Sequence, residues 1–190
     1  MKNSVFRILI FFVLFFTGCS TNKIQNNTNP VYVTNTKTMT LLPLENMDGI
    51  KNSYQLLNGV FGENKFTLLC YIVCDTEKIS IDLLNDFGTD MGNLYYDGNS
   101  VQFASAVFPE NLKAEYILLD IQNAYYRADS VQAAYKASGL IFEEEIQNNT
   151  IIRKIKNGNK IIELITKNGN SVKIQNSLRG YEFNLTEGEE

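Results

Sequence analysis

The feature that most constrains the fold is a succession of short apolar segments separated by turn dipeptides. Asp97-Gly98, Asn157-Gly158 and Asn168-Gly169 each lie between two such segments, and dipeptides of this kind tolerate the positive φ of tight antiparallel hairpins. The chain therefore predicts an antiparallel meander of about eleven strands. The predicted strands cover residues 38–42, 54–60, 66–75, 78–84, 92–96, 100–104, 140–147, 150–156, 160–166, 171–176 and 181–185.

The interval between the two groups of strands has a helical period. Apolar side chains recur on one face from Ala114 to Tyr125, whereas Asp120 and Gln122 fall outside that face, so we expect an amphipathic helix that exposes these two polar groups. Proline suits a first helical turn, and we expect the helix to begin near Pro109.

A second, shorter helix is predicted to follow. Asp129 stands three residues before Gln132 and is expected to cap it. Gly139 stands where a left-handed stop is expected after Ala137. Strands, two helices and more strands predict an α+β fold, with a curved antiparallel sheet over helices on one side.

The first residues are typical of a bacterial lipoprotein signal. The apolar run from Ile8 to Phe16 follows two basic residues and is too short to cross a hydrocarbon core of roughly 30 Å. Thr17-Gly18-Cys19 resembles a lipobox, which implies cleavage before Cys19 and lipidation of its thiol. We therefore expect a signal peptide at 1–18, a polar lipidated tether at 19–37, and one domain at 38–190.

The composition of the chain excludes several kinds of catalytic and metal-binding site. The chain contains no histidine and no tryptophan, which excludes imidazole catalysis and the commonest metal sites. A formal net charge of -4 without basic runs disfavours nucleic acid. The carboxylate groupings are Glu143-Glu144-Glu145 and the pair Asp82 and Asp86. Because neighbouring residues of a strand alternate faces, we expect no catalytic site, no cofactor and no metal. An enzyme that uses the three glutamates remains the alternative.

The segment 66–74 predicts a strand that is apolar on both faces, which we expect to be covered on both sides. Cys70 and Cys74 lie four residues apart in it, about 13 Å in a strand, beyond disulfide reach. We therefore predict two free, buried thiols.

Four stretches, in this order, carry a family resemblance: Ile81-Asp82-Leu83-Leu84-Asn85-Asp86-Phe87-Gly88, Leu94-Tyr95-Tyr96-Asp97-Gly98, Tyr116-Ile117-Leu118-Leu119-Asp120-Ile121-Gln122 and Leu178-Arg179-Gly180-Tyr181. With the lipobox, they resemble a family of small bacterial lipoproteins of unknown function, often encoded beside aryl-polyene biosynthesis genes. That family looks related to LolA and LolB, the carrier and the outer-membrane receptor of lipoproteins. The resemblance implies an incomplete β-barrel with a helical lid and an apolar cavity for acyl chains.

The expected function is that of a lipoprotein anchored to the outer membrane on its periplasmic face. It would hold an acyl chain such as palmitate, or a lipid-linked product, as a carrier or receptor in envelope trafficking, with other envelope proteins as further partners. A domain with a filled core, acting as a structural or scaffolding lipoprotein, is the alternative. The expected lipid-binding residues are Leu68, Cys70, Ile72, Ile79, Ile81, Leu83, Ile117, Leu118 and Ile121.

Overall fold

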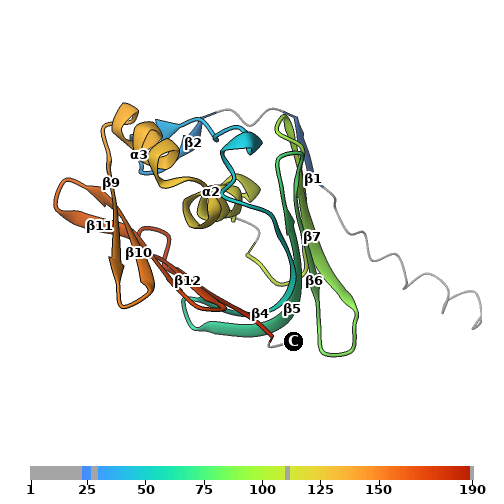
Figure 1. Cartoon of the computed structure of the whole chain (residues 1–190). Helices are drawn as coiled ribbons and strands as arrows, with labels where there is room; N and C mark the ends of the chain where they lie inside the picture. Colours follow the sequence, from blue (N-terminus) through green and yellow to red (C-terminus); the bar gives the residue numbers. More distant parts are fainter. Residues whose placement is uncertain (1–22, 27–29, 110–111, 189–190) are drawn as a thin grey trace, which may run out of the picture.

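The computed structural model describes residues 23–26, 30–109 and 112–188. Its main body is one eleven-stranded antiparallel sheet in the order β1-β8-β7-β6-β5-β4-β13-β12-β11-β10-β9. The sheet bends into an open cradle whose edge strands, β1 and β9, do not pair with each other (Figure 1). Its strands are β1 (Lys23–Asn26), β4 (Lys51–Phe61), β5 (Asn64–Cys74), β6 (Ile79–Leu84), β7 (Asp90–Tyr96), β8 (Ser100–Ser105), β9 (Ile141–Gln147), β10 (Thr150–Asn157), β11 (Lys160–Asn168), β12 (Ser171–Asn176) and β13 (Tyr181–Glu187).

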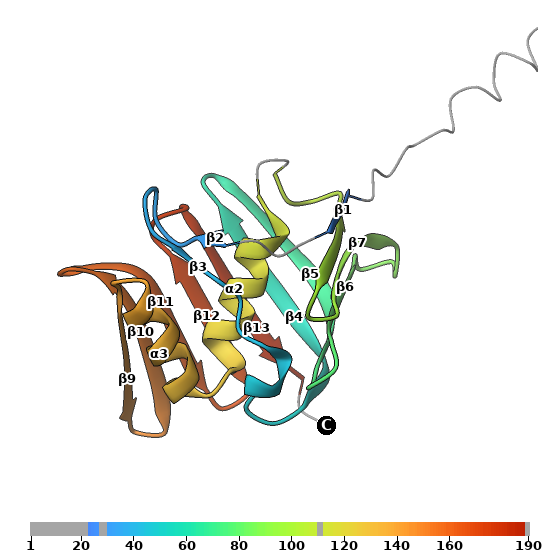
Figure 2. The ribbon, with the colours of Figure 1, turned by 90° about the horizontal axis from the view of Figure 1, so that it is seen from above.

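Two helices lie in the cradle. Helix α2 (Ala114–Tyr125) runs across the concave side of the sheet, and α3 (Ala128–Ala137) lies beside β9 (Figure 2). The incomplete barrel with two helices is thus confirmed. Among the described residues, no helix has the length and apolar character needed to cross a membrane.

The predicted turns are confirmed, because Gly98, Gly158 and Gly169 all adopt positive φ between paired strands. Gly139 also has positive φ and ends α3, with the Leu140 N–H donating to the Tyr135 carbonyl.

Both predicted helix starts differ from the structure. Helix α2 begins at Ala114, because Leu112 and Lys113 are not helical and Lys113 has extended backbone angles. Helix α3 begins at Ala128, so Asp129 lies inside its first turn and is not the capping residue.

The fold begins earlier than Thr38, where the domain was predicted to start. Strands β2 (Val31–Tyr32) and β3 (Thr38–Met39) form a small hairpin of their own. Val31 and Val33 are buried against the core, so part of the segment predicted as a tether belongs to the folded body. Two such short strands carry too few apolar residues to be distinguished from a polar linker by pattern alone. The predicted signal peptide and Cys19 lie outside the described residues.

The segment after β3 passes over α2 on the side opposite the sheet. The side-chain amide of Gln122 accepts from the Leu42 N–H and donates to the Leu42 carbonyl, at 2.9 Å each. A short 3-10 helix, η2 (Leu44–Asn46), follows. Of the twelve residues of α2, only Tyr116 is not buried.

The exposed polar helix face predicted for Asp120 and Gln122 is therefore wrong. Their side chains are 2% and 1% exposed, respectively. The helix is enclosed between the sheet and the segment that passes over it, so its polar face points into protein.

Strand β5 is covered on one side only, contrary to prediction. Leu68, Cys70 and Cys74 are buried on the concave side, and both thiols are free as predicted. Leu69 on the convex side stays 39% exposed. Burial raises the pKa of each thiol to about 12, so both remain protonated.

Gly92 permits the close approach of β7 and β8. It has a φ of 141° and lies beside an irregularity in the pairing of β6 with β7. A Cβ there would stand 2.3 Å from the Ala104 carbonyl oxygen. We expect Gly92→Ala to lower the free energy of unfolding by about 2 kcal/mol, measured by urea denaturation. Gly158→Ala, at a positive-φ turn with open space around it, should cost less; equal losses would contradict the role of the close approach.

Candidate lipid-binding cavity and its mouth

An apolar cavity lies between α2 and the concave side of the sheet. Six of the nine residues predicted to bind lipid line it: Cys70, Ile72, Ile81, Leu83, Ile117 and Ile121. The other three, Leu68, Ile79 and Leu118, are buried in the core but do not line it. The four strand residues among these six lie on the concave face, and the structure adds wall residues from β4, β7, β8, β12 and β13 that sequence reasoning did not name.

The cavity is small in this state. Its volume is about 40 Å³, room for roughly two water molecules and well below the roughly 150 Å³ that holds a benzene molecule in an engineered protein. Side chains of the protein thus fill most of the space under the helix, and the remaining volume is too small for an acyl chain.

Six aromatic side chains form a group of contacting rings, three of which, Phe103, Phe108 and Phe183, line this cavity. We call them the aromatic cluster: Phe61, Phe66, Phe103, Phe108, Tyr181 and Phe183. Phe108 is at the centre, with ring centroids 5.5 Å from Phe66, 6.2 Å from Phe103 and 5.7 Å from Phe183. Unlike the other five, Phe108 comes from a bend between β8 and α2 and not from a strand. The Ser105 hydroxyl oxygen accepts from the Phe108 N–H at 2.9 Å and holds this bend.

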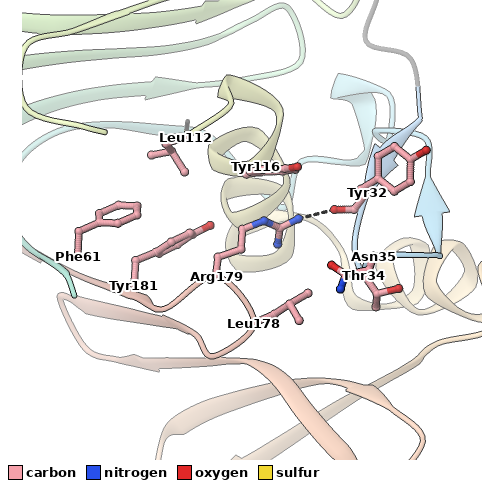
Figure 3. A pocket seen from close by; sticks show the side chains of 9 residues that line it. All are labelled: Tyr32, Thr34, Asn35, Phe61, Leu112, Tyr116, Leu178, Arg179 and Tyr181. Carbon is pink, nitrogen blue, oxygen red and sulfur yellow. Dashed lines mark hydrogen bonds between the residues drawn. The ribbon is translucent and has the colours of Figure 1, made fainter. Parts of the chain in front are cut away.

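An open pocket of about 440 Å³ lies on the other side of the aromatic cluster. It is lined by Tyr32, Thr34, Asn35, Phe61, Leu112, Tyr116, Leu178, Arg179 and Tyr181 (Figure 3). Phe61 and Tyr181 belong to both the pocket wall and the cluster, whose Phe108 and Phe183 line the inner cavity. Phe61 and Tyr181 of the pocket wall are therefore in direct ring contact with Phe108 and Phe183 of the cavity wall.

Sequence reasoning missed this pocket. Arg179 was quoted for the family resemblance and given no role, although a lone arginine between Leu178 and the turn residue Gly180 was the available signal. Nothing in the sequence indicates that Tyr32 and Asn35 line a pocket, because they lie in the polar segment that predicts a tether.

A buried polar cluster connects α2 to the C-terminal half of the sheet. The Tyr181 hydroxyl donates to Asp120 Oδ2 at 2.6 Å, and the Asn123 amide donates to Glu163 Oε1 at 3.1 Å. Burial raises the pKa of Asp120 to about 7. Burial and the nearby Asp120 carboxyl also raise the pKa of Glu163 well above its usual value. Both carboxyls are therefore biased toward their neutral forms.

The carboxylates considered for an enzyme lie apart from the cavity. Each of the three consecutive glutamates forms an ion pair with a basic residue of β10: Glu143 with Lys156, Glu144 with Arg153 and Glu145 with Lys154. Asp82 lies exposed on β6, and Asp86 lies exposed in the following turn. In the part of the chain that the structure describes, no group of three or more acidic or cysteine side chains is placed to hold a metal ion.

The fold and cavity define a class, an open antiparallel half-barrel with a helix packed into its concave side. Residues 52–189 match the family described as "Protein of unknown function (DUF3261)", and the chain belongs to this family. A search of the curated proteins finds no match to the chain.

Proposed function

We propose that this protein is a bacterial outer-membrane lipoprotein, anchored through Cys19 on the periplasmic side, whose half-barrel holds an acyl chain. The chain is palmitate, another lipid or a lipid-linked product, and the protein acts as a non-catalytic carrier or receptor in envelope trafficking. The observation that carries the proposal is the apolar cavity between α2 and the sheet, whose wall is joined to that of an open pocket by contacting aromatic rings.

Opening the cavity is energetically reasonable. Moving Phe108 out of the aromatic cluster costs about 1.5–3 kcal/mol of buried apolar surface. A sixteen-carbon chain that takes its place contributes on the order of 10 kcal/mol at about 0.8 kcal/mol per methylene, before the cost of ordering the chain. The bend that carries Phe108 is held by hydrogen bonds from the Val107 and Phe108 N–H groups to the Ser105 hydroxyl and from the Ala106 N–H to the Met91 carbonyl. Phe108 itself lies outside the strands, so its displacement leaves the sheet pairing intact.

A relationship to LolA and LolB is part of the proposal. The open sheet with a helix in its concave side has the architecture that the sequence resemblance implies. An association with aryl-polyene biosynthesis belongs to the same proposal and rests on the resemblance alone.

A second candidate is a scaffolding lipoprotein that binds another envelope protein. It is favoured by an apolar row on the convex face, where Tyr54 and Leu56 on β4 are 59% and 47% exposed. Leu56 pairs with Leu69 of β5, and the tilted rings of Tyr54 and Tyr71 lie with their centroids 4.6 Å apart. Such a surface is typical of a protein contact.

The two candidates are separated by cross-linking in cells that express the full chain. A palmitate analogue with a photoreactive diazirine on its chain is expected to label residues of the inner cavity, such as Cys70 and Leu94. Ile121→Phe, which fills the cavity, should reduce labelling at least fivefold, whereas Leu69→Phe on the convex face should leave it unchanged.

Labelling is mapped by mass spectrometry, with circular dichroism to confirm that both variants fold. Labelling confined to the convex face, or equal labelling of the two variants, would reject the cavity as the binding site and favour the scaffold.

A further inference from the structure

Arg179 places a positive charge in the open pocket. It lies in the turn between β12 and β13, where its backbone N–H donates to Asn176 Oδ1 at 3.0 Å. Its guanidinium carbon lies 3.7 Å from the centre of the Tyr116 ring, and its Nη2 donates to the Tyr32 carbonyl oxygen (Figure 3). The side chain is thus positioned by two elements that are distant in sequence.

This charge has no acidic partner among the described residues, for which no ion pair of Arg179 is found. The Arg179 charge acts on two buried acids, Asp120 and Glu163, whose pKa values it lowers against the larger effect of burial. The Asp120 carboxyl accepts from the Tyr181 hydroxyl. A guanidinium carries five N–H donors, and the Tyr32 carbonyl accounts for one of them. The remaining donors are suited to a carboxylate or phosphate oxygen in the pocket.

The position of Arg179 relative to the cavity gives the ligand a polarity. Arg179 shares the pocket wall with Phe61 and Tyr181, and these two rings contact Phe183, which lines the inner cavity. A head group bound at Arg179 therefore has its tail directed at the aromatic cluster, behind which the apolar space lies.

We propose that the ligand is a single-chain amphiphile with an anionic head group, a carboxylate or a phosphate, which Arg179 binds at the mouth of the cavity. This inference rests on the proposed function, because it takes the inner cavity as the site of the tail. Recognition of the head fixes the direction in which the chain enters and excludes neutral apolar molecules of similar size.

The test compares hexadecanoic acid with hexadecan-1-ol, which share a chain and differ in head-group charge. Native mass spectrometry of the full chain, released from detergent, gives the apparent affinity for each. We expect the wild type to bind the acid roughly tenfold to a hundredfold more tightly than the alcohol. Arg179→Gln should remove this preference without changing the affinity for the alcohol, and Arg179→Lys should retain part of it. Lys160→Gln, which removes an exposed positive charge on the β10–β11 hairpin, should leave the preference unchanged.

Each other outcome overturns a defined part of the proposal. The wild type could bind acid and alcohol with equal affinity, or Arg179→Gln could lower both affinities to the same extent. In either case Arg179 does not recognise the head group, although the cavity still binds a chain. If inorganic phosphate alone binds as tightly as the acid, the pocket takes a free anion. If neither long-chain compound binds, the proposed function fails together with this inference.

Discussion

Arg153→Met is expected to lower the free energy of unfolding by about 3–5 kcal/mol. The Arg153 side chain is almost fully buried and ion-paired with Glu144, with Nε 2.7 Å from Oε2. Its Nη1 donates to the carbonyl oxygens of Asn123 and Tyr126 at 2.7 and 2.9 Å. These carbonyls stand at the C-terminal end of α2, where a helix leaves such groups without partners and favours a positive charge. The substitution leaves them and a carboxylate unsatisfied.

Lys154→Met is the matched control, because Lys154 is the next residue of β10 and pairs with Glu145 at the surface. An exposed ion pair of this kind contributes about 0–1 kcal/mol. Urea denaturation followed by far-ultraviolet circular dichroism measures both variants. A loss below 1 kcal/mol for Arg153→Met would show that water replaces the guanidinium at the end of the helix.

Strands and turns were predictable because their signals are local. Alternation of apolar residues and the glycines of the hairpins depend on neighbouring positions only, and all the predicted strands from residue 54 onward are present with ends shifted by a few residues. The free state of Cys70 and Cys74 followed from the geometry of one strand. Which face of β5 lines the cavity was not decided by this alternation, because the segment 66–74 is apolar on both faces.

The environment of α2 was not predictable from its own residues. The polar side of an amphipathic helix ordinarily meets water. Here Gln122 is enclosed by the segment that passes over the helix, and Asp120 is enclosed against the sheet, where the Tyr181 hydroxyl of β13 donates to it. The pocket at Arg179 likewise depends on four separate parts of the chain, including the hairpin around Tyr32. A pocket or a buried polar contact that forms only when distant segments meet leaves no periodic pattern of residues in the sequence.

The contribution of Asp120 to the free energy of unfolding is expected to fall as the pH rises from about 4 to 7. Burial holds its carboxyl neutral in the folded protein up to a pKa of about 7, against 3.8 for the ordinary group. Between these values the folded state binds a proton that the unfolded state has lost, so this contribution is complete below pH 4 and is lost as the pH passes 7. A shift of this size corresponds to about 4 kcal/mol.

Asp120→Asn keeps an oxygen to accept from Tyr181 and cannot ionise. We expect the variant to resemble the wild type at pH 5 and to be more stable by several kcal/mol at pH 8, measured by urea denaturation at both values. In this variant Glu163 is expected to leave a smaller decrease of the free energy of unfolding with rising pH, because Glu163 stays buried while the neighbouring acid is gone.

Asp82→Asn removes an exposed carboxylate of β6 and serves as the control. Its free energy of unfolding should change between pH 5 and pH 8 by the same amount as that of the wild type. If the free energy of unfolding of Asp120→Asn changes between pH 5 and pH 8 by as much as that of the wild type, the interior admits enough water to keep Asp120 ionised. The helix that closes the cavity would then already be loosely seated at neutral pH, since Asp120 lies on α2 and lines that cavity. Entry of a chain beneath α2 would in that case require less rearrangement than displacement of Phe108.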